Sequence, residues 1–351
     1  MLPELCLALV MLGITAYAVL GSADFGAGFW DLTAGGAERG GRIRGMVQRS
    51  MSPVWEANHV WLIFVLVIAW TAFPVAFGSV FSTLAIPLFL AALGIIFRGA
   101  AFAMRGHAAT INEARGLGAL FALSSVLIPF FLGAAVGGIA SGRVEVGNAA
   151  GEPFGSWLNP TSLLIGVIAV LSGAYLAAVF LAGDSRRAEQ PDLVRAFRAR
   201  ALAMGALTGL VALAGLLVLR SDAPDLYDGL TSGAGLLMVI LSALAGAVTL
   251  ALVWAERFGP ARLTAALAVA AVVVGWALAQ DPYLLPGKLT FERAAADDAV
   301  LGAVLISMAV GTLILAPSLW FLYRLTLQGR LDQEFEPLDQ RFRPERAGDR
   351  P

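Results

Sequence analysis

Long apolar segments recur along this chain and limit the folds that are open to it. A helix needs roughly 20 mostly apolar residues to cross a bilayer, and 58% of the 351 residues are hydrophobic while 14% are charged. We therefore expect an all-α integral membrane protein rather than a soluble globule. About nine transmembrane helices are predicted, at residues 3–30, 53–75, 79–104, 116–140, 159–183, 198–220, 232–256, 261–280 and 298–323.

Basic residues gather on one side of these segments. If alternate connections face the same side, all but four of the 24 Lys and Arg residues fall on the side of the first connection and the C-terminal tail. The exceptions are Arg143, Arg220, Lys288 and Arg293. Because cytoplasmic loops are enriched in Lys and Arg, the N-terminus is predicted outside and the C-terminus in the cytoplasm.

The number of predicted spans suggests a division of the chain into two helix bundles, a ninth helix and a tail. Four spans return the chain to its starting side, so we predict a first four-helix bundle over residues 1–140 and a second over 141–280. An outer loop and one extra, ninth helix follow at 281–325, and a polar cytoplasmic tail at 326–351. The division rests on the number of spans, because no residue-level repeat relates the two halves.

A polar cluster interrupts the first three predicted spans. The stretch SPVWEANHVWLIF at 52–64 carries Glu56, Asn58 and His59 where hydrocarbon is expected. With the predicted orientation, Asp24 in the first span and Arg98 in the third lie at the same depth, near the cytoplasmic face. Glu56 and His59 are three residues apart and share a helix face. We expect these side chains to meet at one site.

Two interpretations of this cluster stay open. In the first, Arg98 neutralises Asp24 or Glu56, Asn58 links helices, and the set fastens three helices together. In the second, Asp24 and Glu56 carry protons, because intramembrane carboxylates commonly mark proton or ion routes. His59 titrates near neutral pH in its unperturbed form and is a candidate relay.

Several other kinds of site are excluded or not indicated. One cysteine, Cys6, excludes an internal disulfide and a cysteine-based iron–sulfur or zinc site. Two histidines, His59 and His107, are too few for a typical multi-histidine metal or multi-haem centre. The formal net charge of −1 gives no sign of nucleic-acid binding. We expect no directly catalytic, cofactor-binding or metal-binding residue here, so a redox role requires a partner that carries the cofactors.

Motifs along most of the chain resemble subunit II of the cytochrome bd-type quinol oxidases. The first two are SADFGAG, similar to a family motif GFDFGVG, and PVWEANHVWL, similar to PVWDGNEVWL. The third is RGAAFAMRG, similar to RGVAFEFRG. These motifs lie at residues 22–28, 53–62 and 98–106, followed by Phe73-Pro74 and by matches at 158–160, 275–286 and 317–325.

The resemblance implies a subunit of a respiratory quinol:oxygen oxidoreductase in the bacterial cytoplasmic membrane, not catalytic alone. It implies a heterodimer with a haem-bearing subunit I, which holds b-type haem, with d-type haem as a further candidate, and reduces oxygen to water with quinol. A small single-helix third subunit, quinone and phospholipid are further candidate partners. The proton pathway would fall on Asp24, Glu56 and His59, with Trp55, Asn58 and Arg98 shaping the site.

The chain also departs from the family motifs. Glu56 stands where Asp is usual, His59 where Glu or Gln is usual, and Gly21 and Ala103 where a carboxylate often lies. The alternatives are an independent secondary transporter with an ion or substrate site at Asp24, Glu56 and Arg98, and a purely structural assembly subunit. Transporter sites tend to lie near the bilayer midplane, whereas this cluster is predicted near one face.

Overall fold

The structure is a computed structural model, and it describes residues 1–35, 37–51, 55–105, 108 and 110–328. Within these ranges the side chains of residues 37–39, 51, 55–57, 111, 323, 326 and 327 lie outside the description. The predicted tail at 326–351 lies almost wholly beyond the described residues and stays a prediction.

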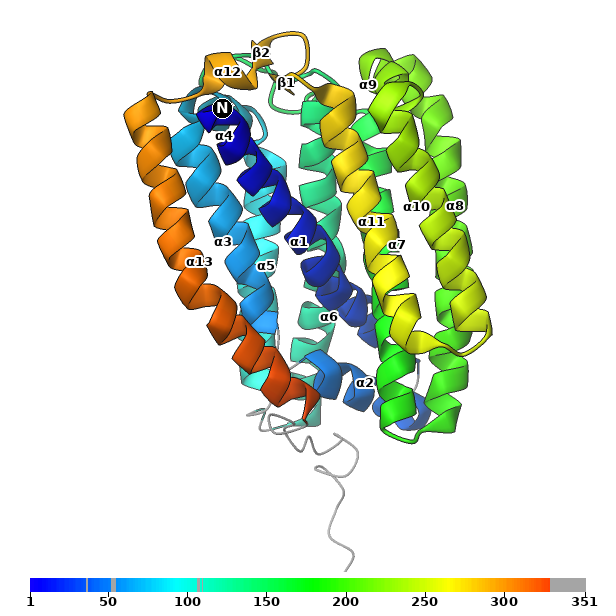
Figure 1. Ribbon diagram of the computed structural model, residues 1–351. Coiled ribbons are helices and arrows are strands. Elements are labelled where there is room, and N and C mark those ends of the chain that lie inside the picture. The colour runs from blue at the N-terminus through cyan, green and yellow to red at the C-terminus, as the bar shows by residue number, and fades with distance from the viewer. Residues whose placement is uncertain (36, 52–54, 106–107, 109, 329–351) are drawn as a thin grey trace, which may run out of the picture.

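Helices dominate the described chain (Figure 1). Eight described helices are long and apolar enough to cross a membrane, and the number becomes nine when α3 and α4 are taken as one bent span. The predicted all-α membrane fold is confirmed. The helices are α1 (Leu2–Leu32), α2 (Ala37–Met51), α3 (Trp55–Ala72), α4 (Pro74–Thr83), α5 (Ala85–Arg105), α6 (Ile111–Ala140), α7 (Pro160–Arg187), α8 (Pro191–Asp222), α9 (Pro224–Leu230), α10 (Gly233–Trp254), α11 (Phe258–Gln280), α12 (Phe291–Ala294) and α13 (Asp298–Leu327).

A short antiparallel hairpin joins α11 to α12. Its strands are β1 (Tyr283–Leu285) and β2 (Leu289–Thr290). The hairpin, α4, α9 and α12 gather at one end of the long helices, while α2 lies at the opposite end (Figure 1). Under the predicted orientation, α2 is therefore on the cytoplasmic side.

The second predicted span ends in a sharp bend. Helix α3 stops at Ala72, and α4 leaves it at 119°. Pro74 has no N–H to donate to the carbonyl of Trp70, four residues back, so the helix cannot continue through it. Beyond the break, the Ala72 carbonyl accepts a hydrogen bond from the Ala296 backbone N–H at 2.8 Å. Residues 79–83, which we assigned to the third span, belong to α4, so that prediction was wrong at its start. The third long helix, α5, begins at Ala85.

Helix α2 lies in a segment that we predicted as a connection. Its apolar side chains Ile43, Met46 and Val47 are buried against the bundle. Four arginines lie among its other positions, so this helix is amphipathic, as expected at a membrane surface. The sequence analysis missed this helix because it searched for long apolar segments, and α2 has too few apolar residues to cross a membrane.

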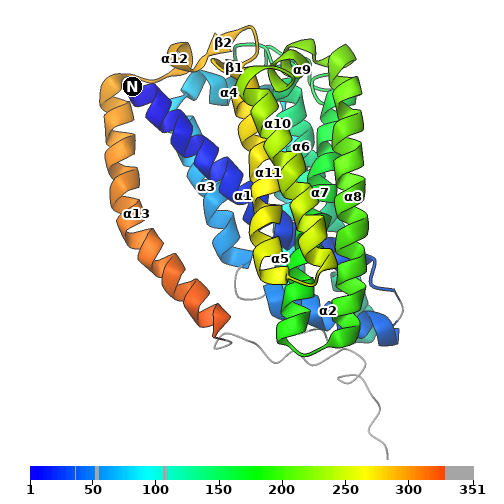
Figure 2. The same ribbon diagram turned by 45° about the vertical axis from the view of Figure 1, so that its right-hand side comes forward.

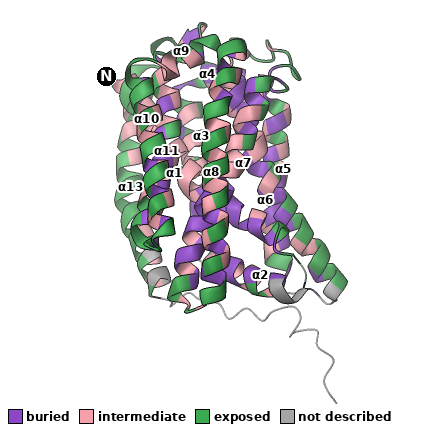
Figure 3. Ribbon diagram, turned by 90° about the vertical axis from the view of Figure 1, so that its right-hand side faces the viewer, coloured by how far each residue is buried: buried purple, intermediate pink, exposed green. Residues whose placement is uncertain are grey.

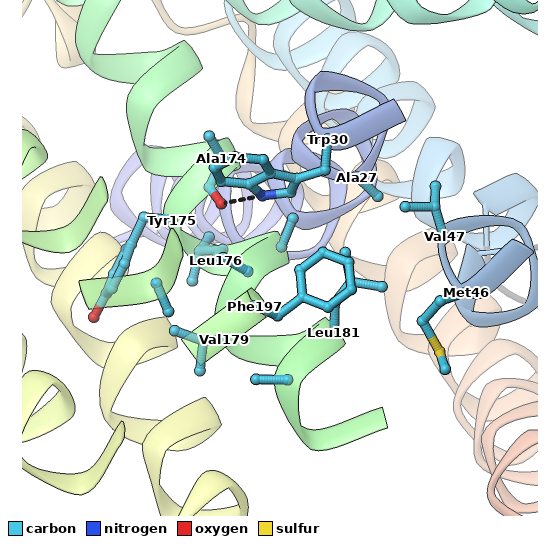
Figure 4. Close-up of a cluster of buried hydrophobic side chains, with 14 of the residues drawn as sticks. Ala27, Trp30, Met46, Val47, Ala174, Tyr175, Leu176, Val179, Leu181 and Phe197 are labelled. Atoms are coloured by element: carbon cyan, nitrogen blue, oxygen red, sulfur yellow. Dashed lines mark hydrogen bonds between the residues drawn. The ribbon is translucent and has the colours of Figure 1, made fainter. Parts of the chain in front are cut away.

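Close packing joins α1 to α7 in the middle of the molecule. A Cβ atom at Gly26 would lie 1.8 Å from the carbonyl oxygen of Gly173, so the two backbones cross where no side chain fits. Trp30 then donates an indole hydrogen bond to the Ala174 carbonyl oxygen at 2.8 Å, within a cluster of buried apolar side chains (Figure 4).

Other helix contacts extend from this crossing. Helix α1 also packs against α3, α6 and α11, while α5 packs on α6 and α7 on α8. Because α6 and α1 both contact α7, the packing is continuous across residue 140, and the division into two bundles stays a prediction.

The distribution of buried and exposed residues is that of a membrane protein. Buried residues concentrate where the helices face one another, and exposed residues run along the outward faces (Figure 3). Large apolar side chains are exposed there, among them Leu210, Leu217 and Ile314, as lipid-facing surfaces require. Helix α13 contacts α1 and α3 and extends away from the other helices (Figure 2).

Candidate functional site

Asp24 and Arg98 form a buried ion pair between α1 and α5. The Arg98 Nη1 atom lies 2.9 Å from Asp24 Oδ2, and Nη2 lies 3.0 Å from Oδ1. Both side chains are almost fully buried, at 2% exposed for Arg98 and 3% for Asp24. The guanidinium donates two parallel hydrogen bonds to the carboxylate, which is the strongest common geometry for such a pair.

The rest of the Arg98 guanidinium is also occupied. Its Nε donates to Ser125 Oγ on α6 at 2.9 Å, and Nη2 also donates to the Asp24 backbone carbonyl at 3.3 Å. The rings of Phe25 and Phe121 flank it, with centroids 5.2 and 4.8 Å from Cζ. Arg98 therefore links three helices, and the pair is a fixed arrangement of charge.

The start of α3 brings two more of the predicted residues to α1. Asn58 is buried and donates from Nδ2 to the Leu20 carbonyl oxygen at 3.3 Å. His59 is partly buried, with its Nδ1 atom 3.5 Å from the Tyr17 hydroxyl oxygen. Its ring lies beside the rings of Tyr17 and Phe25, each with a centroid separation of 6.1 Å. Asn58 and His59 thus lie one to two turns from Asp24 along α1.

The structure brings Asp24, Asn58, His59 and Arg98 into one region, as predicted, in the part of the bundle nearer to α2. Trp55 and Glu56 begin α3, but their side chains lie outside the described residues. Their predicted roles are therefore untested. His107 is also outside the described residues.

A second buried ion cluster was missed by the sequence analysis. Asp31 lies two turns below Asp24 on α1, and its Oδ2 atom is 2.8 Å from Arg105 Nη1 on α5. Its Oδ1 atom is 3.1 Å from Nε of Arg44 on α2. We had placed both arginines in connections.

Sequence spacing carried a signal for this second cluster. Asp24 and Asp31 are seven residues apart, as are Arg98 and Arg105. A seven-residue step covers about two helical turns and returns to nearly the same face, so two pairs in the same register on two helices would have been predictable.

The Asp24 and Asp31 clusters have a different chemical role from the titratable side chains of α3. Asp24 and Asp31 each accept from guanidinium groups, so they act as fixed counter-ions. His59 has a neutral neighbour, the Tyr17 hydroxyl, and imidazole is the side chain whose unperturbed pKa lies nearest neutral pH. Within the described residues, no three His, Cys, Asp or Glu side chains are grouped so that they could hold a metal ion.

Comparison with known proteins gives a consistent family assignment. A family described as cytochrome bd terminal oxidase subunit II matches residues 2–326. The chain is 25% identical over 325 residues to a Bacillus subtilis (strain 168) protein named "Putative cytochrome bd menaquinol oxidase subunit II", covering 90% of this chain and 92% of that one.

A solved structure is similar over almost the same extent. A chain of the bd oxidase from Geobacillus thermodenitrificans matches with a TM-score of 0.78 and 28% identity, covering 93% of this chain and 99% of that chain. Together with the helical fold and the buried polar cluster at the predicted residues, these matches assign the chain: it belongs to the cytochrome bd terminal oxidase subunit II family and is the second subunit of a cytochrome bd-type quinol oxidase.

Proposed function

We propose that this chain pairs with a haem-bearing subunit I in a bacterial cytoplasmic membrane and helps cytoplasmic protons reach that partner during quinol-driven oxygen reduction. The name of the family and the bd oxidase match support the pairing. A small third subunit, bound quinone and phospholipid belong to the same proposal, as expected components of the complex.

His59 is the one histidine among the described residues. A haem held by two histidines therefore cannot be built from the described part of this chain alone. Haem, b-type with d-type as a further candidate, is therefore proposed for subunit I, where it would supply the electron transfer and oxygen chemistry.

The observation that carries the proton role is the gathering of Asp24, Asn58, His59 and Arg98 within about two turns of α1 in an otherwise apolar bundle. Asp24 and Arg98 supply a fixed pair of charges, and Asn58 ties the start of α3 to α1. Glu56 and His59, at the start of α3, would then be the groups that take and release protons. Asp24 takes part in the pathway as a charge that orients the site, and Trp55 shapes its opening.

The family assignment does not support an independent transporter.

Quinol oxidase turnover of three variants tests the proposal. We expect Glu56→Gln to lower turnover at least ten-fold in a complex with full haem content, because an amide cannot carry a proton. His59→Gln is expected to give a smaller loss. The matched control is Glu113→Gln, an exposed glutamate in the first turn of α6, which should keep normal turnover. Full turnover in Glu56→Gln would leave the cluster with a structural role alone.

A further inference from the structure

Asp31 connects three elements through one carboxylate. Each of its two oxygens faces a different guanidinium, Arg105 of α5 on one side and Arg44 of α2 on the other. Asp31 and Arg105 are about 5% exposed, and Arg44 is 29% exposed. The cluster therefore reaches from the buried interior of the bundle to its α2 end.

The surroundings of Arg44 are shaped to hold this contact. Its Nη2 atom donates to the Gly35 carbonyl oxygen at 3.0 Å. A Cβ atom at Gly40 would lie 2.6 Å from Arg44 Nη1 and 2.5 Å from the Gly35 oxygen. Glycine at position 40 thus lets the guanidinium fold back over the start of α2, and any larger residue would displace it.

An apolar layer separates this cluster from the Asp24–Arg98 pair. Ala27 lies between the two aspartates on α1, Ala101 between the two arginines on α5, and Phe121 faces them from α6; all three are buried. The side chains of these three residues offer no polar partner to a water molecule. The seam between α1, α5 and α6 is thus closed twice among the described residues, by an ion cluster and by apolar packing.

The net charge of the Asp31 cluster also opposes the entry of protons into the seam. Two guanidinium groups face one carboxylate, so Asp31 and its partners carry a net positive charge, which repels an approaching hydronium ion. On the α3 side of the same bundle, His59 is partly exposed, and no arginine pair is present among the described side chains of its first turns.

We propose that Asp31 is a positioning residue: with Arg44 and Arg105 it closes the cytoplasmic end of the α1–α5–α6 seam and so directs protons to the polar cluster from the α3 side. Its part in proton delivery rests on the proposed function. The closure itself does not, because it concerns access of water and solutes to the seam in the resting complex.

Thiol labelling of the assembled complex tests the closure directly. In a Cys6→Ala background, Ala101→Cys places a thiol in the seam, and His59→Cys places one on the α3 side. A small cationic methanethiosulfonate reagent is applied to the cytoplasmic face of inverted vesicles. We expect His59→Cys to react at least ten-fold faster than Ala101→Cys. Equal rates would overturn the proposal without any change at Asp31 or its arginines.

Substitutions at α2 test which side chain provides the closure. Arg44→Gln should raise the labelling rate of Ala101→Cys at least ten-fold, and Arg44→Lys should largely restore protection. The matched control is Arg42→Gln, on the same helix, which removes an exposed arginine 3.5 Å from Asp192 and should leave the rate unchanged.

An unchanged rate in Arg44→Gln, or an equal rise in Arg42→Gln, would refute the assignment to Arg44. Because labelling is measured without turnover, failure here differs from failure of the proton pathway. Full turnover of Glu56→Gln would remove the pathway and still leave the labelling result in force.

Discussion

Removing the charge of Asp24 is expected to destabilise the protein strongly. In Asp24→Asn, the guanidinium of Arg98 would stay 2% exposed but would lose the carboxylate that accepts two of its N–H groups. Breaking a buried ion pair by removing one partner typically costs about 3–5 kcal/mol. The new amide still offers one oxygen, and Ser125 still accepts from Nε, so we expect about 3 kcal/mol.

The free energy of unfolding is measured by detergent titration of the purified complex in mixed micelles, followed by tryptophan fluorescence. The matched control is Asp192→Asn, which breaks the pairs of Asp192 with Arg42 and Arg195, in which all three side chains are more than half exposed. Exposed pairs contribute about 0–1 kcal/mol, so the control should stay near the parent.

A double variant separates the charge from the packing. Asp24→Leu combined with Arg98→Met removes both charges, and replacing a whole buried pair by apolar side chains is often nearly neutral. We expect it to be more stable than Asp24→Asn. If Asp24→Asn lies within about 1 kcal/mol of the parent, Arg98 does not depend on the carboxylate and our description of the pair as a fixed counter-ion is wrong.

Two further predictions concern packing and the outer end of the bundle. Gly26→Ala should prevent assembly of the complex, measured as haem-containing yield, because its Cβ would lie 1.8 Å from the Gly173 oxygen; Gly209→Ala, which meets no atom within 4 Å, should assemble normally. Asp222→Asn should lower stability by about 1–3 kcal/mol in the same detergent titration, because the carboxylate accepts from Arg143 at 2.6 Å and from the Thr161 backbone at 3.0 Å. An unchanged unfolding curve for Asp222→Asn would contradict that role.

Long apolar segments made the fold predictable. Most long helices correspond to predicted spans because a membrane helix satisfies its backbone internally and must be apolar over its length. The bend at Pro74 was missed since the residues on both sides of it are equally apolar, and hydropathy does not detect a change of direction. Helix α2 was missed because its stability comes from burying Ile43, Met46 and Val47 against other helices, a contact that the local sequence does not show.

The candidate site was predictable in part. Costly polar residues inside apolar spans indicated Asp24, Asn58 and Arg98, and the structure brings them together. The choice of Asp24 as the partner of Arg98 was left open, because it depends on how α5 is rotated toward α1. Asp31 was not predicted, since it falls at the end of a span where a charge is inexpensive.

Proton uptake from the cytoplasmic side during a single turnover tests the central claim most directly. Complexes with full haem content would be followed with a pH-sensitive dye as oxygen reacts with the reduced enzyme, for the parent, Glu56→Gln and Glu113→Gln. We expect uptake in Glu56→Gln to slow at least ten-fold while Glu113→Gln matches the parent. Parent-like uptake in Glu56→Gln would contradict the account and show that protons reach subunit I by a route that does not use the polar cluster of this chain.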